Sequence, residues 1–272
     1  MKSSQALLAV IVCAVLPLNA ADLSDLIYTT TDVKVTITDC KTAASGELVI
    51  PDTIEGKPVT NIGVSAFWDC ASLTSITIPD SVTSIGRFAF FWCDSLTNIT
   101  LPDSVTSIRE SAFDGCTSLT SITIPYSVTS IEFNALRRCT NLTSITIPDS
   151  VTSIESEAFG RCTSLTEVIF LGDAPKEGKE VFKDSVPTIY RKPEAKGWGD
   201  TFAGRPVKLI SSVSSEALAD SIERKVELAQ FDSALSLIDS FLLKYPDDPK
   251  VDEIKTLRGR INKFQQLEDF SE

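Results

Sequence analysis

Residues 70–92 read CASLTSITIPDSVTSIGRFAFFW, and nearly the same phrase follows three more times. A cysteine begins each copy: the positions are Cys70, Cys93, Cys116, Cys139 and Cys162, each 23 residues after the one before. The fifth copy, residues 162–184, keeps less of the phrase. A fixed period of this length is typical of a solenoid, in which each copy is one coil that buries its apolar face only against its neighbours. The function is therefore expected on a surface made by repetition.

Each copy predicts the path of one coil. Alternating polar and apolar residues over 73–78 indicate a strand with one buried face. Pro79 ends this strand because it has no N–H group to donate. A second extended run is expected over 81–85, and Ala89-Phe90 closes the coil with an apolar plug. Stacked at equal intervals, these positions form apolar columns, with roughly 1.5–3 kcal/mol for each fully buried side chain.

The repeated cysteines are expected to be reduced and buried. A residue at the same place in every coil forms a structural column, and cysteine is a small apolar group that is readily buried. Neighbouring coils of a parallel sheet lie about 4.8 Å apart, so a pair of cysteines could in principle form a disulfide. A column of five would always leave one thiol unpaired. We therefore favour thiols, and expect neither a zinc site nor a redox role.

The composition excludes several classes of function. The formal net charge is −12 and the chain has no histidine. Nucleic acid and anionic membranes both require a positive field, so neither is expected as a partner. The lack of histidine removes Ser-His-Asp and Cys-His catalysis. No glycine-rich phosphate loop is present. We expect no enzyme, no catalytic residue, no metal and no cofactor.

Residues 1–20 predict a secretory signal peptide. Lys2 provides a positive start, residues 7–16 form an apolar run too short to span a membrane, and Ala20 offers a cleavage point. This segment predicts a secreted, periplasmic or cell-surface protein that is not inserted in a membrane after cleavage.

The phrase LTSITIPDSVTSI followed by AF and then cysteine resembles the BspA-like branch of the leucine-rich repeats. The resemblance covers about residues 28–210. It implies a β-rich leucine-rich-repeat solenoid with 23-residue coils and a cap at each end. We assign residues 21–69 to the N-terminal cap and a degenerate first repeat, 70–184 to the repeats, and 185–210 to the C-terminal cap. The family also implies surface-displayed binding and adhesion rather than catalysis.

The pattern changes after residue 210. Apolar residues recur at helical spacing and predict a helix from about residue 216, a second helix capped by Asp232, and a third over 251–267. Segment 211–272 resembles a single tetratricopeptide repeat followed by one helix. About three such units are needed for independent stability. This α-helical appendage is therefore expected to support the last coil or to provide self-association.

Candidate ligand-binding residues lie just before each cysteine and just before each plug, where the repeat is not constant. Variation in a constant frame is what a ligand-binding edge needs, and aromatic residues and arginine are favoured at interfaces. An aromatic patch is predicted at one end of this edge and a basic patch at the other; the alternative is drift at solvent-facing positions. The candidates are Trp68, Arg87, Phe88, Phe91, Trp92, Phe133, Arg137, Arg138 and Arg161.

The outward strand face is expected to be flat and rich in hydroxyl groups, as in Ser75 and Thr77. Such columns mostly satisfy strand propensity on a wet face. Taken together, the sequence predicts a secreted or cell-surface, non-enzymatic binding or adhesion protein with a protein or glycan ligand. The alternatives are a structural scaffold or self-assembling envelope component, a glycan-active enzyme, and an ice-binding protein.

Overall fold

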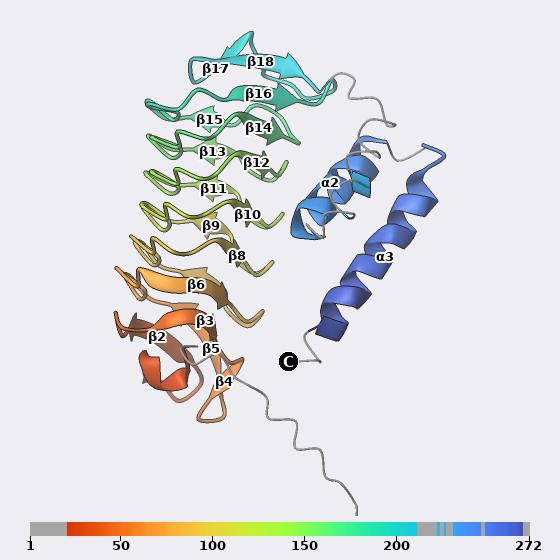
Figure 1. Cartoon of the computed structure of the whole chain (residues 1–272). Coiled ribbons are helices and arrows are strands. Elements are labelled where there is room, and N and C mark those ends of the chain that lie inside the picture. Colours follow the sequence, from red (N-terminus) through yellow and green to blue (C-terminus); the bar gives the residue numbers. More distant parts are fainter. Residues whose placement is uncertain (1–20, 211–221, 224–225, 227–230, 246–247, 269–272) are drawn as a thin grey trace, which may run out of the picture. The chain divides into compact units, whose positions relative to one another are not determined.

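The computed structural model describes residues 21–210, 222–223, 226, 231–245 and 248–268. They divide into two compact units: residues 21–210, and a second unit that holds the described residues after 210. The first unit is a β-solenoid whose coils stack one on another (Figure 1). The predicted signal peptide and most of the first expected helix of 211–272 lie outside the described residues.

The chain enters the solenoid through a short 3-10 helix, η1 (Leu23–Asp25), and then forms strands throughout the first unit. The strands are β1 (Leu26–Thr30), β2 (Val35–Cys40), β3 (Ser45–Val49), β4 (Thr53–Ile54), β5 (Lys57–Ile62), β6 (Ser72–Thr77), β7 (Ser84–Ile85), β8 (Asn98–Thr100), β9 (Ser107–Ile108), β10 (Ser121–Thr123), β11 (Ser130–Ile131), β12 (Ser144–Ile147), β13 (Ser153–Ile154), β14 (Glu167–Phe170), β15 (Lys176–Glu177), β16 (Thr188–Arg191), β17 (Thr201–Phe202) and β18 (Arg205–Leu209).

Two series of parallel strands run along the stack with equivalent residues in register. On the longer series, Ile76 of β6 pairs with Ile99 of β8, which pairs with Ile122 of β10. On the shorter series, Ile108 of β9 pairs with Ile131 of β11 and Ile131 with Ile154 of β13. The 23-residue period of the sequence is therefore the period of the fold, as predicted.

The second extended run is shorter than the sequence predicts. It covers Ser84–Ile85 in β7 rather than residues 81–85. Residues 79–82 form a tight turn instead, in which the Val82 N–H donates to the Pro79 carbonyl oxygen at 3.0 Å. The same bond recurs one coil later, from Val105 to Pro102 at 3.0 Å.

The remaining side of each coil consists of turns, and these also pair with their neighbours. The Phe67 N–H donates to the Ala89 carbonyl at 2.7 Å, and the Phe90 N–H donates to the Ala112 carbonyl at 2.8 Å. These donors point toward the following coil. Beside the strands, the Thr97 N–H donates at 3.0 Å to Thr74 of the preceding coil. The backbone groups of one coil are thus satisfied by both neighbours, which is why a coil needs them.

The core confirms the predicted apolar columns. Each member of the leucine column is at most 1% exposed; its members are Leu73, Leu96, Leu119, Leu142 and Leu165. In the plug column the rings of Phe67, Phe90 and Phe113 stack with centroids 5.2 Å apart. Leu136 interrupts the ring stack, which resumes at Phe159 and Phe182 with centroids 5.6 Å apart.

The second unit contains the helices α2 (Phe231–Lys244) and α3 (Val251–Glu268). They bury one apolar face against each other, including Ile238, Phe241 and Ile254. Asp232 lies inside α2 rather than before it, because the helix begins at Phe231. The third expected helix is confirmed within a residue. The likeness of this unit to a tetratricopeptide repeat stays a prediction.

Replacing Phe113 by alanine should remove the last ring of the stack that it forms with Phe90 and Phe67. It should lower the free energy of unfolding by about 3–5 kcal/mol, as for other buried aromatic residues. Chemical denaturation measures this loss. The matched control is Phe133→Ala, because Phe133 is 40% exposed and should cost far less. Equal losses in the two variants would contradict the assignment of the core.

Candidate functional site

The edge formed by the turns has an unusual backbone. In each coil the residue before the plug and the residue before the cysteine have positive φ, as at Phe88 (φ 58°) and Trp92 (φ 59°). The left-handed conformation costs roughly 1–2 kcal/mol for a residue with a side chain. Backbone hydrogen bonds to the next coil hold this conformation. The Phe88 N–H donates to the Glu110 carbonyl oxygen at 2.9 Å, and the Trp92 N–H donates to the Asp114 carbonyl oxygen at 3.0 Å. The edge is therefore a rigid frame that accepts many kinds of side chain.

Four aromatic side chains on this edge, Trp68, Phe88, Phe91 and Trp92, form what we call the aromatic cluster. Phe91 lies at its centre, with its ring centroid 4.4 Å from Trp68, 5.7 Å from Phe88 and 5.2 Å from Trp92. Trp68 is 42% exposed and Trp92 is 46% exposed. The cluster thus packs as a unit while two indole rings remain open to solvent.

Gly115 creates the space for Trp92. A Cβ atom at Gly115 would lie 2.1 Å from Cδ1 of the Trp92 ring, far inside van der Waals contact. The φ of Gly115 is +84°, which also favours glycine. The orientation of the Trp92 ring therefore depends on a glycine in the following coil, 23 residues later.

Two further predicted residues are Arg87 and Phe133, and the structure brings only Arg87 to the aromatic cluster. The guanidinium carbon of Arg87 lies 5.8 Å from the centre of the Phe88 ring, and Arg87 forms an ion pair with Glu110. Phe133 occupies the same position as Arg87, but two coils later in the stack. It makes no ring contact with the cluster. Phe133 is therefore exposed but separate.

The other half of the edge holds an ionic network of Asp114, Arg137, Arg138, Glu157 and Lys183. Asp114 is contacted by Arg137 at 3.7 Å and by Arg138 at 3.4 Å. Glu157 is contacted by Arg137 at 3.4 Å and by Lys183 at 3.3 Å. Arg161 lies nearby in the chain and pairs with Asp184 at 3.5 Å.

The three arginines of the predicted basic patch are paired with acidic side chains. Arg137 and Arg138 share Asp114, and Arg161 pairs with Asp184. The Asp114 side chain is only 2% exposed. Burial raises the pKa of Asp114, and the positive charges of Arg138 and Arg137 oppose the rise. The two arginines therefore hold a buried carboxylate in place.

Sequence reasoning missed the acidic partners, although a signal was present. Opposite charges recur one period apart in the chain, at Arg87 and Glu110, Arg109 and Glu132, Asp114 and Arg137, and Arg161 and Asp184, and all four pairs are in contact. In a solenoid, residues one period apart are direct neighbours across the stack, like facing residues of two strands.

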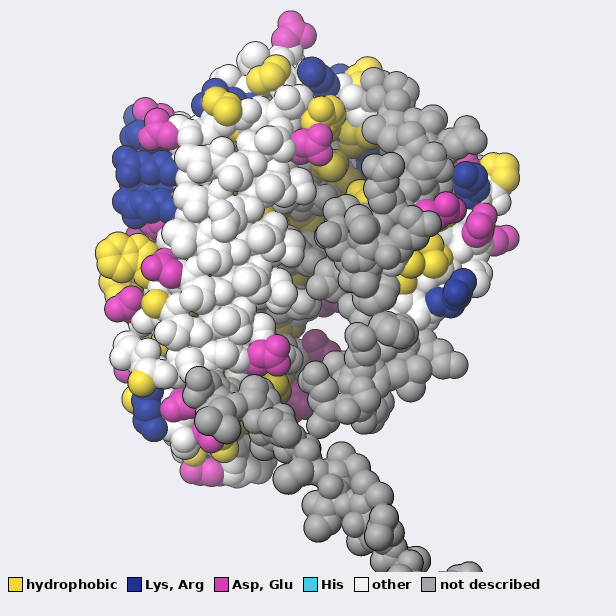
Figure 2. All heavy atoms as spheres, in the orientation of Figure 1, with side chains coloured by type: hydrophobic (Ala, Val, Ile, Leu, Met, Phe, Trp, Pro, Cys, Tyr) yellow, Lys and Arg dark blue, Asp and Glu magenta, His cyan; other side chains and the backbone are white. Residues whose placement is uncertain are grey.

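Figure 2 shows a broad face with few charged or hydrophobic side chains, and along its left edge a hydrophobic patch beside a group of Lys and Arg side chains. The outward face of β6, β8 and β10 carries exposed hydroxyl groups at Thr77, Thr100 and Thr123. Another threonine column is structural: the hydroxyl groups of Thr97 and Thr120 each donate at 3.1 Å to the carbonyl of the preceding threonine.

The cysteines lie in the core, as predicted. The thiol of Cys93 donates to the Phe67 carbonyl at 3.1 Å, and that of Cys116 to the Phe90 carbonyl at 3.1 Å. Ser185 continues the column one coil after Cys162, and its hydroxyl donates to the Phe159 carbonyl at 2.8 Å. Cys40 and the five repeat cysteines are free thiols in the structure. The column thus supplies one side-chain hydrogen bond per coil.

Burial governs the reactivity of these thiols. It raises the pKa of Cys116 and Cys139 well above the ordinary thiol value, and that of Cys162 to about 12. Cys40 differs, because hydrogen bonding with the Cys70 thiol lowers the pKa of Cys40 and raises that of Cys70. Cys40 is buried like the other thiols, at 2% exposed, but among the described thiols it is the one whose pKa is lowered, which favours the thiolate.

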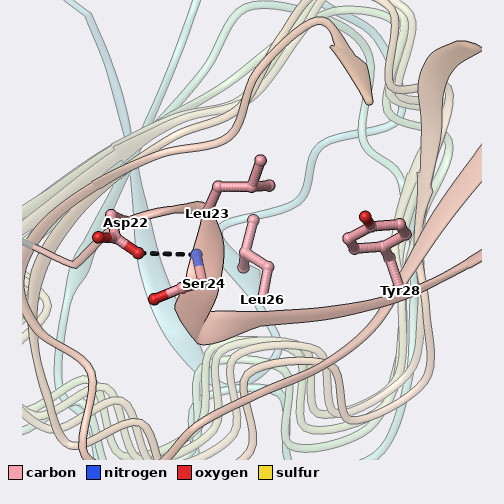
Figure 3. A pocket seen from close by; sticks show the side chains of 5 residues that line it. All are labelled: Asp22, Leu23, Ser24, Leu26 and Tyr28. Atoms are coloured by element: carbon pink, nitrogen blue, oxygen red, sulfur yellow. Dashed lines mark hydrogen bonds between the residues drawn. The ribbon is translucent and has the colours of Figure 1, made fainter. Parts of the chain in front are cut away.

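The entry to the solenoid is only slightly hollowed. A shallow depression at the entry to the solenoid is lined by Asp22, Leu23, Ser24, Leu26 and Tyr28 (Figure 3). Its one carboxylate accepts the Ser24 N–H at 2.7 Å, so it caps η1. In the part of the chain that the structure describes, no three Cys, Asp or Glu side chains converge as a metal site would require, and no helix is long and apolar enough to cross a membrane.

Comparison with known proteins agrees with this geometry. A family model described as the BspA type leucine rich repeat region matches residues 60–187 in six copies. A leucine-rich repeat protein of T. pallidum has 28% sequence identity and a TM-score of 0.53, covering 63% of this chain and 85% of its own. One from Bacteroides ovatus has 25% identity and a TM-score of 0.49, covering 68% of this chain and 56% of its own. No curated protein sequence matches the chain.

The first of these structures supports the fold over the 63% of this chain that it covers. The chain is a leucine-rich-repeat solenoid, and the family model and this likeness support the BspA type of that repeat.

Arg138→Ala should lower the free energy of unfolding by about 1–3 kcal/mol near neutral pH, because the buried Asp114 carboxylate loses a partner. A carboxyl group whose pKa is raised by folding binds its proton better in the folded state, so its ionisation costs stability as pH rises. The loss should therefore shrink in mild acid. Denaturation of the variant and wild type at several pH values measures it.

Two further variants control this experiment. In the Asp114→Asn background, adding Arg138→Ala should change the free energy of unfolding by an amount that does not depend on pH, because neither protein then has a carboxyl group at position 114. Arg109→Ala removes a more exposed pair and should cost only about 0–1 kcal/mol. A loss in Arg138→Ala that is independent of pH would contradict the role given to Asp114.

Alkylation of the native protein by iodoacetamide at mildly alkaline pH should modify Cys40 first. The four thiols from Cys93 to Cys162 should react only after denaturation, because their raised pKa values and burial suppress the thiolate. Peptide mapping by mass spectrometry identifies the labelled sites. Rapid labelling of Cys116 in the native state would disprove the burial of the column.

Proposed function

We propose that this chain is a non-enzymatic binding protein that works outside the cell or at its surface, and that the aromatic cluster is the main part of its binding surface. The single observation that carries this proposal is the packed cluster of Trp68, Phe88, Phe91 and Trp92 with two indole rings open to solvent. Isolated apolar residues on a surface are common, but a contiguous aromatic group is typical of an interaction site.

The frame around the cluster supports binding rather than simple drift. Phe88 and Trp92 occupy left-handed positions where Asn, Asp or Gly would be less strained. Gly115 leaves room for the Trp92 ring. A rigid aromatic surface loses little conformational entropy when it binds, which favours affinity. The outcome is a preformed platform for a protein or glycan ligand. Its extracellular setting follows from the predicted signal peptide and from the implied family.

Trp68→Ala combined with Trp92→Ala should weaken retention of the protein at least about tenfold. Retention is measured on a glycan array and on a panel of purified extracellular-matrix proteins. The melting temperature of the double variant should stay close to that of the wild type, since both side chains are substantially exposed. Tyr126→Ala is the matched control, because Tyr126 is an exposed aromatic residue outside the edge. Equal retention of wild type and the double variant would end the proposal.

A further inference from the structure

The aromatic cluster lies among acidic residues that lack a basic partner. Asp69 follows Trp68 directly, and Asp94 lies two residues after Trp92. Both side chains are on exposed residues. In the described part of the chain, neither carboxylate forms an ion pair with a lysine or arginine. Figure 2 shows acidic side chains close to the hydrophobic patch on this edge. The surface near the cluster therefore carries uncompensated negative charge.

The two carboxylates also act on each other. Partial burial raises the pKa of Asp94, and the negative charge of Asp69 raises it further. A cation placed between the two would relieve this repulsion. Other carboxylates of the edge are paired: Glu110 with Arg87, and Asp114 with Arg137 and Arg138.

The aromatic rings favour the same kind of ligand. The faces of tryptophan rings attract cations, and a guanidinium group also stacks on them through its flat shape. The cluster already holds one such group, since the guanidinium of Arg87 lies 5.8 Å from the centre of the Phe88 ring. Trp68 and Trp92, which are 42% and 46% exposed, can accept another.

We infer that the aromatic cluster, together with Asp69 and Asp94, docks a basic segment of a partner protein. An arginine side chain of that segment lies over the exposed tryptophan rings, and its charge is balanced by the two carboxylates. This inference rests on the proposed binding function and specifies its ligand. A neutral glycan would use the ring faces but would gain nothing from the charge of Asp69 and Asp94.

The test uses the full chain and a tryptophan-free peptide of alternating arginine and glycine, followed by tryptophan fluorescence. Trp198, the third tryptophan, gives a constant background because it packs against Phe170 at 4.8 Å and donates to the Gly172 carbonyl at 3.2 Å. The arginine peptide should shift the fluorescence of the cluster, and the matching glutamate–glycine peptide should not. Binding should weaken strongly near 1 M salt, where the screening length falls to about 3 Å.

Variants separate docking from general attraction to an acidic protein. Asp69→Asn with Asp94→Asn should weaken binding about three- to thirtyfold while preserving shape. Asp103→Asn with Asp149→Asn removes the same charge from exposed turn residues of other coils and should leave binding nearly unchanged. Trp92→Ala should weaken binding, and Phe133→Ala should not.

The outcomes distinguish this inference from the proposed function. Equal weakening by the two pairs of aspartate variants would overturn it, since the attraction would then be general. A second contrary result is retention on a neutral glycan that Trp92→Ala abolishes but that neither salt nor Asp69→Asn with Asp94→Asn changes. This result would overturn the inference of a basic partner and leave the proposed binding function intact. If Trp68→Ala combined with Trp92→Ala left retention unchanged, both the inferred basic partner and the proposed binding function would be contradicted.

Discussion

Exact register between coils is the constraint on which the rest of this structure depends. Because each coil has the same length, equivalent backbone groups face one another: Ile76 pairs with Ile99 and Ile99 with Ile122. The turns add a ladder of opposite polarity, in which Phe67 donates forward to Ala89 while Thr97 donates back to Thr74. Each coil is therefore held from both sides, and the leucine, cysteine and phenylalanine columns follow as a consequence. Burial in these columns, rather than any compact centre, supplies the hydrophobic stabilisation.

The same constraint produces the surface. The ladder between turns fixes left-handed backbone at Phe88 and Trp92, whose types rarely adopt it, and neighbouring coils determine how their side chains lie. Trp92 rests where Gly115 of the next coil has no side chain, and Asp114 is buried beneath two arginines of the coil after it. Recognition chemistry on this edge is thus a property of adjacent coils, and no single coil contains it.

Much of the fold could be predicted from the sequence, and less of the site. The repeat predicts the columns through Leu73 and Cys93 because burial leaves little choice at those positions. It does not predict that residues 79–82 turn rather than extend, since the bond from Val82 to Pro79 depends on backbone geometry. The aromatic residues were found from their variation, and four of them do meet. The sequence also does not predict that the arginines of the expected basic patch pair with acidic residues, because a long arginine side chain can reach a carboxylate of the adjacent coil. Only the spacing of opposite charges, as in Asp114 and Arg137, carried that information.

Charge pairs separated by one period also limit how such a surface can change. Adding or removing an entire coil leaves every ladder intact, but it gives Glu110 or Arg137 a different neighbour and shifts the aromatic cluster relative to the ionic network by one step of about 4.8 Å. A shorter insertion would break the stack. Spacing along the solenoid axis is therefore discrete, and chains of this architecture can acquire new arrangements of surface groups by recombination of whole repeats without any redesign of the interior.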